Sequence, residues 1–116
     1  MLLYNFDRIF RARAIDKPFS YLQKAGFSDN FASRIKNNRV SRLDLKQIER
    51  LCILFKCTPL DFMEWIPDKD TSVDDSHPLN VLKKSVDYVD MVKTISEIPL
   101  GKLEHIEKLI LDEMKK

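Results

Sequence analysis

Glycine, alternating β-branched residues and long apolar runs are all scarce in this chain. Only two of the 116 residues are glycine, and no cluster of alternating β-branched residues occurs, which argues against a sheet protein with tight turns. The longest uninterrupted apolar run, Leu51 to Phe55, is far shorter than the roughly 20 residues of a membrane-spanning helix. Asp7 and Arg8 interrupt the segment where a signal peptide would be apolar. We therefore expect a soluble, cytoplasmic protein without a membrane segment.

Residues for metal or catalytic chemistry are equally scarce. Cys52 and Cys57 do not have the spacing of a CxxC pair, and on one helix they would lie on different faces. The two histidines, His77 and His105, have no cysteine beside them in the sequence. No Ser/His/Asp set, Cys/His set or glycine-rich phosphate loop indicates catalysis. We expect no metal, no cofactor and no enzymatic activity.

Positive charge is concentrated in the first part of the chain. The net charge of +2 divides into +5 for residues 1–66 and −3 for residues 67–116. All seven arginines lie within the first 50 residues: Arg8, Arg11, Arg13, Arg34, Arg39, Arg42 and Arg50. Arginine is preferred over lysine where planar, bidentate contacts to phosphate or guanine are needed. The first half is therefore predicted to bind a polyanion.

Apolar spacing and capping residues predict five helices before residue 67. They are expected over residues 2–14, over residues 18–25, over residues 28–37, from Asp44 onward, and from Thr58 to Trp65. Pro18 suits a first helical position, and Gly26 suits the end of a helix. In the fourth helix the expected core stripe is Leu45, Ile48, Leu51, Cys52 and Phe55. Phe62 and Trp65 are also expected in the core.

The composition changes after Pro67. Residues 68–78 are mostly Asp, Ser, Thr and Lys, which is typical of a solvated linker. Two amphipathic helices are expected over residues 79–98 and 100–114, broken at Pro99. A hairpin of fewer than 40 residues buries too little surface to be stable alone. We predict an all-α protein with a five-helix domain over residues 1–67, a linker over residues 68–78 and a C-terminal helical hairpin over residues 79–116.

One stretch in the first domain is specific: PFSYLQKAGFSDNFASRIKNN at residues 18–38. A short helix, a turn with Gly26 and a second helix opened by Ser28 form a helix-turn-helix. With one helix before it and two after it, residues 1–67 resemble the Cro / lambda-repressor-like (XRE-type) DNA-binding family. Other matching fragments are Ser33-Arg34-Ile35-Lys36-Asn37, Asp44-Leu45, Leu51-Cys52 and Cys57-x-Pro59-x-Asp61.

The resemblance implies that the recognition helix, residues 28–37, enters the major groove of double-stranded DNA. Side chains expected to face the DNA there are Ser28, Asp29, Asn30, Phe31, Ser33 and Arg34. Asn30 suits adenine, Arg34 suits guanine, and Phe31 suits a thymine methyl group. Phosphate contacts are expected from Lys17, Lys36, Arg39 and Arg42.

Several positions depart from the family pattern. Leu22 replaces a usual alanine and Ala32 replaces a usual large aliphatic residue, and these two positions normally touch. We interpret the pair as a size swap that conserves core volume. Asp29 stands where a donor is common, and it either accepts a hydrogen bond from cytosine N4 or favours the dipole of the recognition helix. Pro18 replaces a usual glutamine, so Lys17 is expected to supply the phosphate contact.

The resemblance implies a sequence-specific transcriptional regulator of bacterial or mobile-element origin, without a cofactor. Proteins with this motif commonly bind two half-sites, and the wide apolar stripe of residues 79–116 favours a homodimer through these helices. The alternative is an antitoxin-like protein whose C-terminal helices bind a partner protein and whose DNA binding serves autoregulation.

Overall fold

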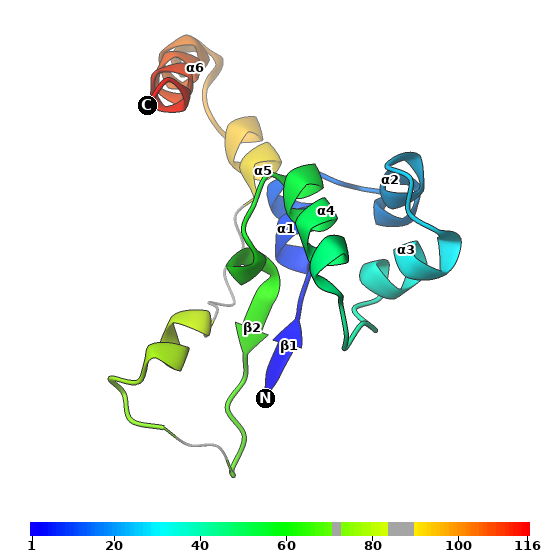
Figure 1. The fold of residues 1–116 in the computed structure, drawn as a ribbon. Helices are drawn as coiled ribbons and strands as arrows, with labels where there is room; N and C mark the ends of the chain where they lie inside the picture. Colours follow the sequence, from blue (N-terminus) through cyan, green and yellow to red (C-terminus); the bar gives the residue numbers. More distant parts are fainter. Residues whose placement is uncertain (71–72, 84–89) are drawn as a thin grey trace.

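The computed structural model describes residues 1–70, 73–83 and 90–116, and it consists of short helices and one small sheet (Figure 1). The elements, with η for 3₁₀ helices, are β1 (Leu2–Tyr4), α1 (Asp7–Ala12), α2 (Pro18–Lys24), α3 (Asp29–Lys36), α4 (Leu45–Phe55), η1 (Pro59–Phe62), β2 (Met63–Trp65), η2 (Pro78–Leu82), α5 (Met91–Ser96) and α6 (Leu100–Met114). The prediction of a mainly helical protein with a helix-turn-helix near the N-terminus is confirmed.

The two-stranded sheet corrects the all-α prediction. β1 and β2 pair antiparallel, with Leu3 opposite Glu64. The expected helix over residues 2–14 begins only at Asp7, and the expected fifth helix is a 3₁₀ turn followed by β2. Neither strand has alternating β-branched residues, and no hairpin turn joins the strands, because they lie at opposite ends of the domain. The local signals that identify strands are therefore missing.

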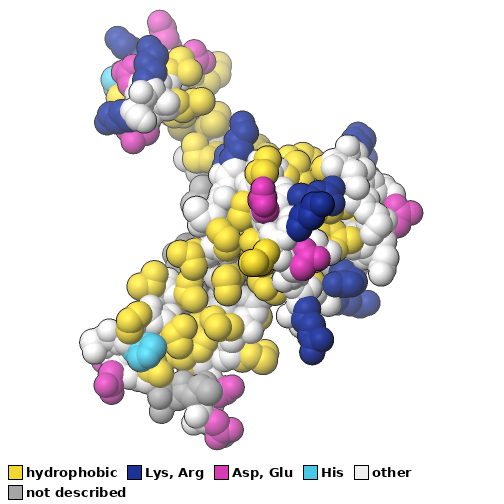
Figure 2. All heavy atoms as spheres, viewed as in Figure 1, with side chains coloured by type: hydrophobic (Ala, Val, Ile, Leu, Met, Phe, Trp, Pro, Cys, Tyr) yellow, Lys and Arg dark blue, Asp and Glu magenta, His cyan; other side chains and the backbone are white. Residues whose placement is uncertain are grey.

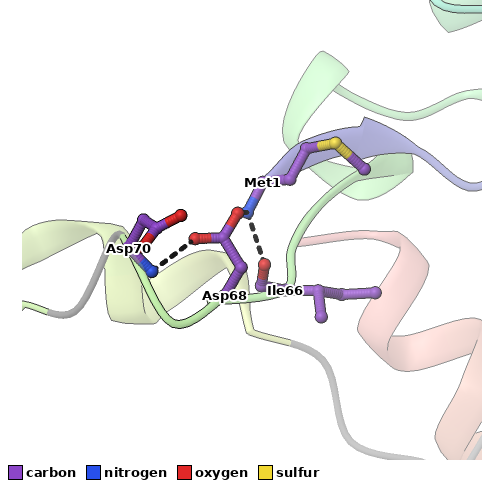
Figure 3. Close-up of polar contacts among 4 residues, drawn as sticks. All are labelled: Met1, Ile66, Asp68 and Asp70. Atoms are coloured by element: carbon purple, nitrogen blue, oxygen red, sulfur yellow. Dashed lines mark hydrogen bonds and ion pairs between the residues drawn. The ribbon is translucent and has the colours of Figure 1, made fainter.

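Backbone pairing continues one residue beyond the sheet (Figure 3). The Ile66 N–H donates to the Met1 carbonyl at 3.0 Å, and the Met1 ammonium group donates to the Ile66 carbonyl. The Asp68 carboxylate lies 3.9 Å from the Met1 nitrogen and also accepts a hydrogen bond of 3.1 Å from the Asp70 N–H. The two ends of residues 1–66 are therefore held together where the polar segment begins.

Aromatic rings fill much of the core of residues 1–66. Phe6 stacks on Phe62 with ring centroids 5.0 Å apart, and Phe10 packs edge-on against Phe55 at 6.0 Å. The other members of this buried cluster are Ile9, Leu22, Phe27, Phe31, Ala32, Ile35, Val40 and Leu51. The core prediction for Phe55 and Phe62 is confirmed. Because bulky side chains from segments distant in sequence meet here, the positions of the helices depend on one shared core.

Two expected core residues behave differently from that cluster. Leu45 is 84% exposed, so its assignment to the core stripe is wrong; it is the first residue of α4 and lies beyond the end of the core. Trp65 is 4% exposed, as expected, but it lies outside the main cluster. The Lys83 ammonium lies over the Trp65 ring, 5.4 Å from the ring centroid. The segment that follows η2 therefore contributes to the cover of this tryptophan.

The first predicted C-terminal helix is interrupted, whereas the second is confirmed, since α6 spans Leu100–Met114 as predicted. The expected helix over residues 79–98 is not continuous, because η2 ends at Leu82, Lys83 is extended and α5 begins at Met91. Residues 84–89 of that prediction lie outside the described residues. The break at Pro99 is confirmed, since this residue precedes α6. No residue of α5 or α6 is buried, and α6 stands apart from α1 to α4 (Figure 1).

Candidate nucleic-acid interface

Local sequence signals set the position of α2 and α3. Pro18 is the first residue of α2, and Gly26 takes a φ of +96° in the turn, a conformation that glycine adopts without strain. The Ser28 hydroxyl caps α3 by accepting from the Phe31 N–H at 3.2 Å. The predicted turn and cap are confirmed. α3 therefore begins at a defined point, with its first backbone N–H groups at an exposed helix end.

The inner face of α3 packs on α2. Leu22 from α2 and Ala32 and Ile35 from α3 are fully buried. A large residue on α2 and a small one on α3 thus occupy the same core, as the size-swap interpretation requires. Direct exchange of volume between Leu22 and Ala32 stays a prediction. Because these side chains point inward, the opposite side of α3 is left to solvent.

The outer face of α3 carries most of the predicted base-contacting side chains. Asp29 and Asn30 are exposed, whereas Ser33 and Arg34 are half-buried. Phe31 does not belong to this face: it is only 7% exposed, and its ring stacks on that of Phe27 at 5.0 Å. Little of the ring is therefore exposed, and the contact between Phe31 and a thymine methyl group stays a prediction. The Phe31 ring packs against Phe27, between α3 and the turn that precedes it.

An arginine extends the stack beneath α3. The Arg50 guanidinium lies 4.1 Å from the centroid of the Phe27 ring, and Phe27 in turn contacts Phe31. Stacking of this kind is favourable because the cation faces the negative face of the ring. Sequence reasoning missed this role and grouped Arg50 with the arginines for a polyanion. No local pattern indicates this contact, because Phe27 and Arg50 are far apart in the sequence.

The end of α3 is tied to the start of α1. Asn38 has a φ of +53°, which asparagine tolerates better than most residues. Its Oδ1 accepts a hydrogen bond of 3.0 Å from the Phe6 N–H. This contact was not predicted, because the two residues are far apart in the sequence. This bond fixes the C-terminal end of α3, and the Ser28 cap fixes its N-terminal end.

A second unpredicted hydrogen bond crosses the turn. Gln23 Nε2, in the last turn of α2, donates to Asp29 Oδ1 over 2.7 Å. On the same outer surface Asn37 Nδ2 donates to the Ser33 hydroxyl at 3.4 Å. The first of these bonds connects the two helices of the motif through exposed side chains.

Two groups can be distinguished among the seven arginines. Arg13 donates to the carbonyls of Phe55 and Lys56 at 3.0 and 3.1 Å, and therefore satisfies the C-terminal end of α4. Arg8 lies 3.8 Å from the Glu64 carboxylate, with both side chains largely buried. Together with Arg50, these residues serve the fold, so the clustering of arginine overstates the charge available to a ligand.

The second group surrounds α3. Arg39 and Arg42 lie in the loop between α3 and α4 and are exposed, as are Lys36 at the end of α3 and Lys17 at the start of α2. None of these four takes part in an ion pair within the described ranges. Figure 2 shows Lys and Arg side chains over the half of the molecule that holds α2, α3 and α4, and hydrophobic side chains over β2 and η2. These four side chains therefore form a basic surface around the helix-turn-helix.

The two cysteines lie together, against the expectation of separate faces. Lys56 has a φ of +54° and reverses the chain, so the Cys57 N–H donates to the Cys52 carbonyl at 3.1 Å and the two thiols hydrogen-bond. Burial raises the pKa of Cys57 to about 12 and also raises that of Cys52. Both thiols stay protonated near neutral pH and act as apolar filling. In the described ranges no three His, Cys, Asp or Glu side chains are grouped to hold a metal.

Comparison with known families agrees with this geometry. The profile of the Cro/C1-type HTH DNA-binding domain matches residues 5–68. No curated protein and no solved structure gives a significant match to the chain. Among the described helices, none is both long and apolar enough to cross a membrane. The matched region covers more than half of the sequence and contains α1 to α4, β2 and every predicted DNA-contacting residue. The chain therefore belongs to the Cro/C1-type (XRE) helix-turn-helix DNA-binding family.

Proposed function

We propose that the protein is a sequence-specific transcriptional regulator that places α3 in the major groove of double-stranded DNA. The observation that carries the proposal is the outer face of α3, where Asn30 and Arg34 lie between basic residues that have no ion-pair partner in the described residues. A helix of this kind presents its first two turns to base edges.

The side chains of α3 divide into base-reading and phosphate-binding roles. Asn30 pairs with adenine and Arg34 with guanine, each through two hydrogen bonds, and Ser33 adds a hydroxyl beside them. Ser28 and the free N–H groups at the start of α3 bind a phosphate. Further phosphates are bound by the exposed side chains that flank the motif: Lys17, Lys36, Arg39 and Arg42. Four such contacts give a slope of about −4 for log K against log salt.

Fluorescence anisotropy with DNA from the region upstream of the protein's own gene tests this assignment. Wild type, Asn30→Ala and Arg34→Ala are compared on that duplex and on a scrambled one at two salt concentrations. We expect each substitution to remove about 1–3 kcal/mol of preference for the specific duplex and to retain salt-sensitive binding to both. Lys108→Ala, on exposed α6, is the matched control. The absence of binding to any duplex at low salt contradicts the proposal.

We further propose that the C-terminal helices join two copies of the chain. Leu103, Ile106 and Ile110 recur at helical spacing on one side of α6, and no residue of this helix is buried. A homodimer would place two recognition helices on half-sites about one DNA turn apart. Sedimentation equilibrium of wild type and Ile106→Glu tests this assembly: we expect a dimer and a monomer, respectively. A monomeric wild type favours the antitoxin-like alternative, in which α6 binds a different protein.

A further inference from the structure

The hydrogen bond between Gln23 and Asp29 is a feature that binding to phosphates does not require. Both side chains are exposed, yet Gln23 Nε2 and Asp29 Oδ1 are only 2.7 Å apart. Exposed polar pairs lose side-chain entropy when they hold one geometry. A short bond to a charged acceptor is the kind that outweighs this loss. The pair therefore gives the start of α3 a defined side-chain arrangement.

Asp29 is not needed to cap α3. The Ser28 hydroxyl already accepts from the Phe31 N–H. In the described part of the chain, Gln23 is the one side chain that hydrogen-bonds Asp29, and it engages Oδ1. The second carboxylate oxygen, Oδ2, is left as an acceptor at the exposed first turn of α3. This is the turn that the proposed function places against base edges.

The chemistry of a carboxylate restricts what it can read in the major groove. A carboxylate only accepts hydrogen bonds. Guanine presents the acceptors N7 and O6 there, and thymine presents the acceptor O4. Neither base can donate a hydrogen bond to the Asp29 carboxylate from these atoms. Adenine offers a donor at N6 beside its N7 acceptor, whereas cytosine offers the N4 donor alone. The base best matched to Asp29 is therefore cytosine.

We propose that Asp29 selects a cytosine at one position of the operator, and that Gln23 is the positioning residue that holds Asp29 for this contact. This inference rests on the proposed function, in which α3 lies in the major groove. It goes further by naming the base that Asp29, the first residue of α3, contacts. Gln23 acts through Asp29 and touches no base. With Oδ1 held towards α2, the carboxylate cannot turn freely away from the DNA, so its preference is sharpened.

Selection from a randomised duplex library, followed by sequencing, tests the pair. The proteins are wild type, Asp29→Asn, Gln23→Met and the double variant, with Lys24→Met as a control at the neighbouring exposed position of α2. We expect wild type to enrich cytosine at one position and Asp29→Asn to lower that enrichment about tenfold. Gln23→Met should lower it several-fold at the same position only. The double variant should match Asp29→Asn, because Gln23 has nothing left to position.

The outcomes separate this inference from the function on which it rests. If wild type selects an operator but neither Asp29→Asn nor Gln23→Met changes any base preference, Asp29 serves only the helix dipole and the inference is wrong, while the regulator proposal stands. If Gln23→Met alters all positions equally, its role is structural and the positioning claim is wrong. If wild type enriches no sequence at all, both proposals are overturned. Equal enrichment by Lys24→Met and wild type shows that the effect belongs to Gln23.

Discussion

In residues 1–66, phenylalanines from α1, α3, α4 and the segments between the helices are buried in one core. In α5 and α6, by contrast, no residue is buried. Both parts are amphipathic in sequence, so the difference does not come from composition. It comes from partners: α1 to α4 bury each other's apolar faces, while α6 has none among the described elements that buries its own. Amphipathic spacing alone therefore does not tell whether a helix finds its partner within the same chain.

The comparison also separates two kinds of stability. The buried cluster that supports α3 is formed by side chains of residues 6–62. An isolated helix as short as α6 is only marginally stable in water. We therefore expect contact with another surface to stabilise α6, and the proposed dimer would supply that surface.

The largest expected effect contrasts one core residue with one α6 residue. Phe6→Ala removes a fully buried ring that stacks on Phe62, and it should lower the free energy of unfolding by about 3–5 kcal/mol. Leu109→Ala, at a site that is 51% exposed, should change it by less than about 0.5 kcal/mol. Urea denaturation followed by the fluorescence of Trp65 measures both. Equal losses would mean that α6 belongs to the same folding unit.

The next effect tests how tightly α2 and α3 fit together. Ala32→Leu adds volume at a fully buried position and should cost about 1–3 kcal/mol. Combining it with Leu22→Ala restores the total volume, so the double variant should recover much of the loss. The same denaturation assay measures the four proteins of the cycle. A double variant no more stable than the single ones would show that the two side chains do not exchange volume.

A smaller effect distinguishes the two groups of arginines. Arg13→Met removes both hydrogen bonds to the end of α4 and should cost about 1 kcal/mol of stability with little change in DNA affinity. Arg39→Met should leave stability unchanged and reduce the salt slope of DNA binding by about 1. Thermal unfolding and salt titrations measure the two properties. If both variants alter the same property, the division of the arginines is wrong.

The last effect concerns a thiol and appears only at alkaline pH. The pKa of Cys57 rises from its ordinary 9.0 to about 12 in the folded domain, so the unfolded chain ionises first as the pH increases. Stability should therefore decline between pH 9.0 and about 12. At pH 8 iodoacetamide should modify Cys57 at least about tenfold more slowly than a cysteine introduced by Ser96→Cys on exposed α5. Mass spectrometry of the modified peptides measures the two rates, and equal rates contradict burial.

Much of the helix-turn-helix could be predicted because its signals are local. Pro18, Gly26 and Ser28 each act within a few residues, and all three occur where expected. The sheet could not be predicted, since β1 and β2 lie at opposite ends of residues 1–66 and neither carries a local strand signal. The burial of the Phe31 ring was missed as well, because its partner is a ring in the preceding turn.

The candidate site shows the same division. Which residue types occupy the start of α3 can be read from the sequence, and so can their exposure as first-turn residues. The contacts that orient them cannot, because Gln23, Asn38 and Arg50 come from three other segments. Arginine clustering was informative but incomplete, since a guanidinium that satisfies helix carbonyls looks the same in sequence as one that binds phosphate.

The pairing of β1 with β2 has a consequence for synthesis on the ribosome. β1 is made early, and its partner follows about 60 residues later, which takes about 3–12 s at translation rates of roughly 5–20 residues per second. During that interval α2 and α3 can form locally, but Phe6 lacks Phe62 and the core stays open. The domain closes when β2 emerges, before α5 and α6 are complete. Nascent chains thus acquire a finished DNA-binding unit before they acquire the helices proposed to join two copies.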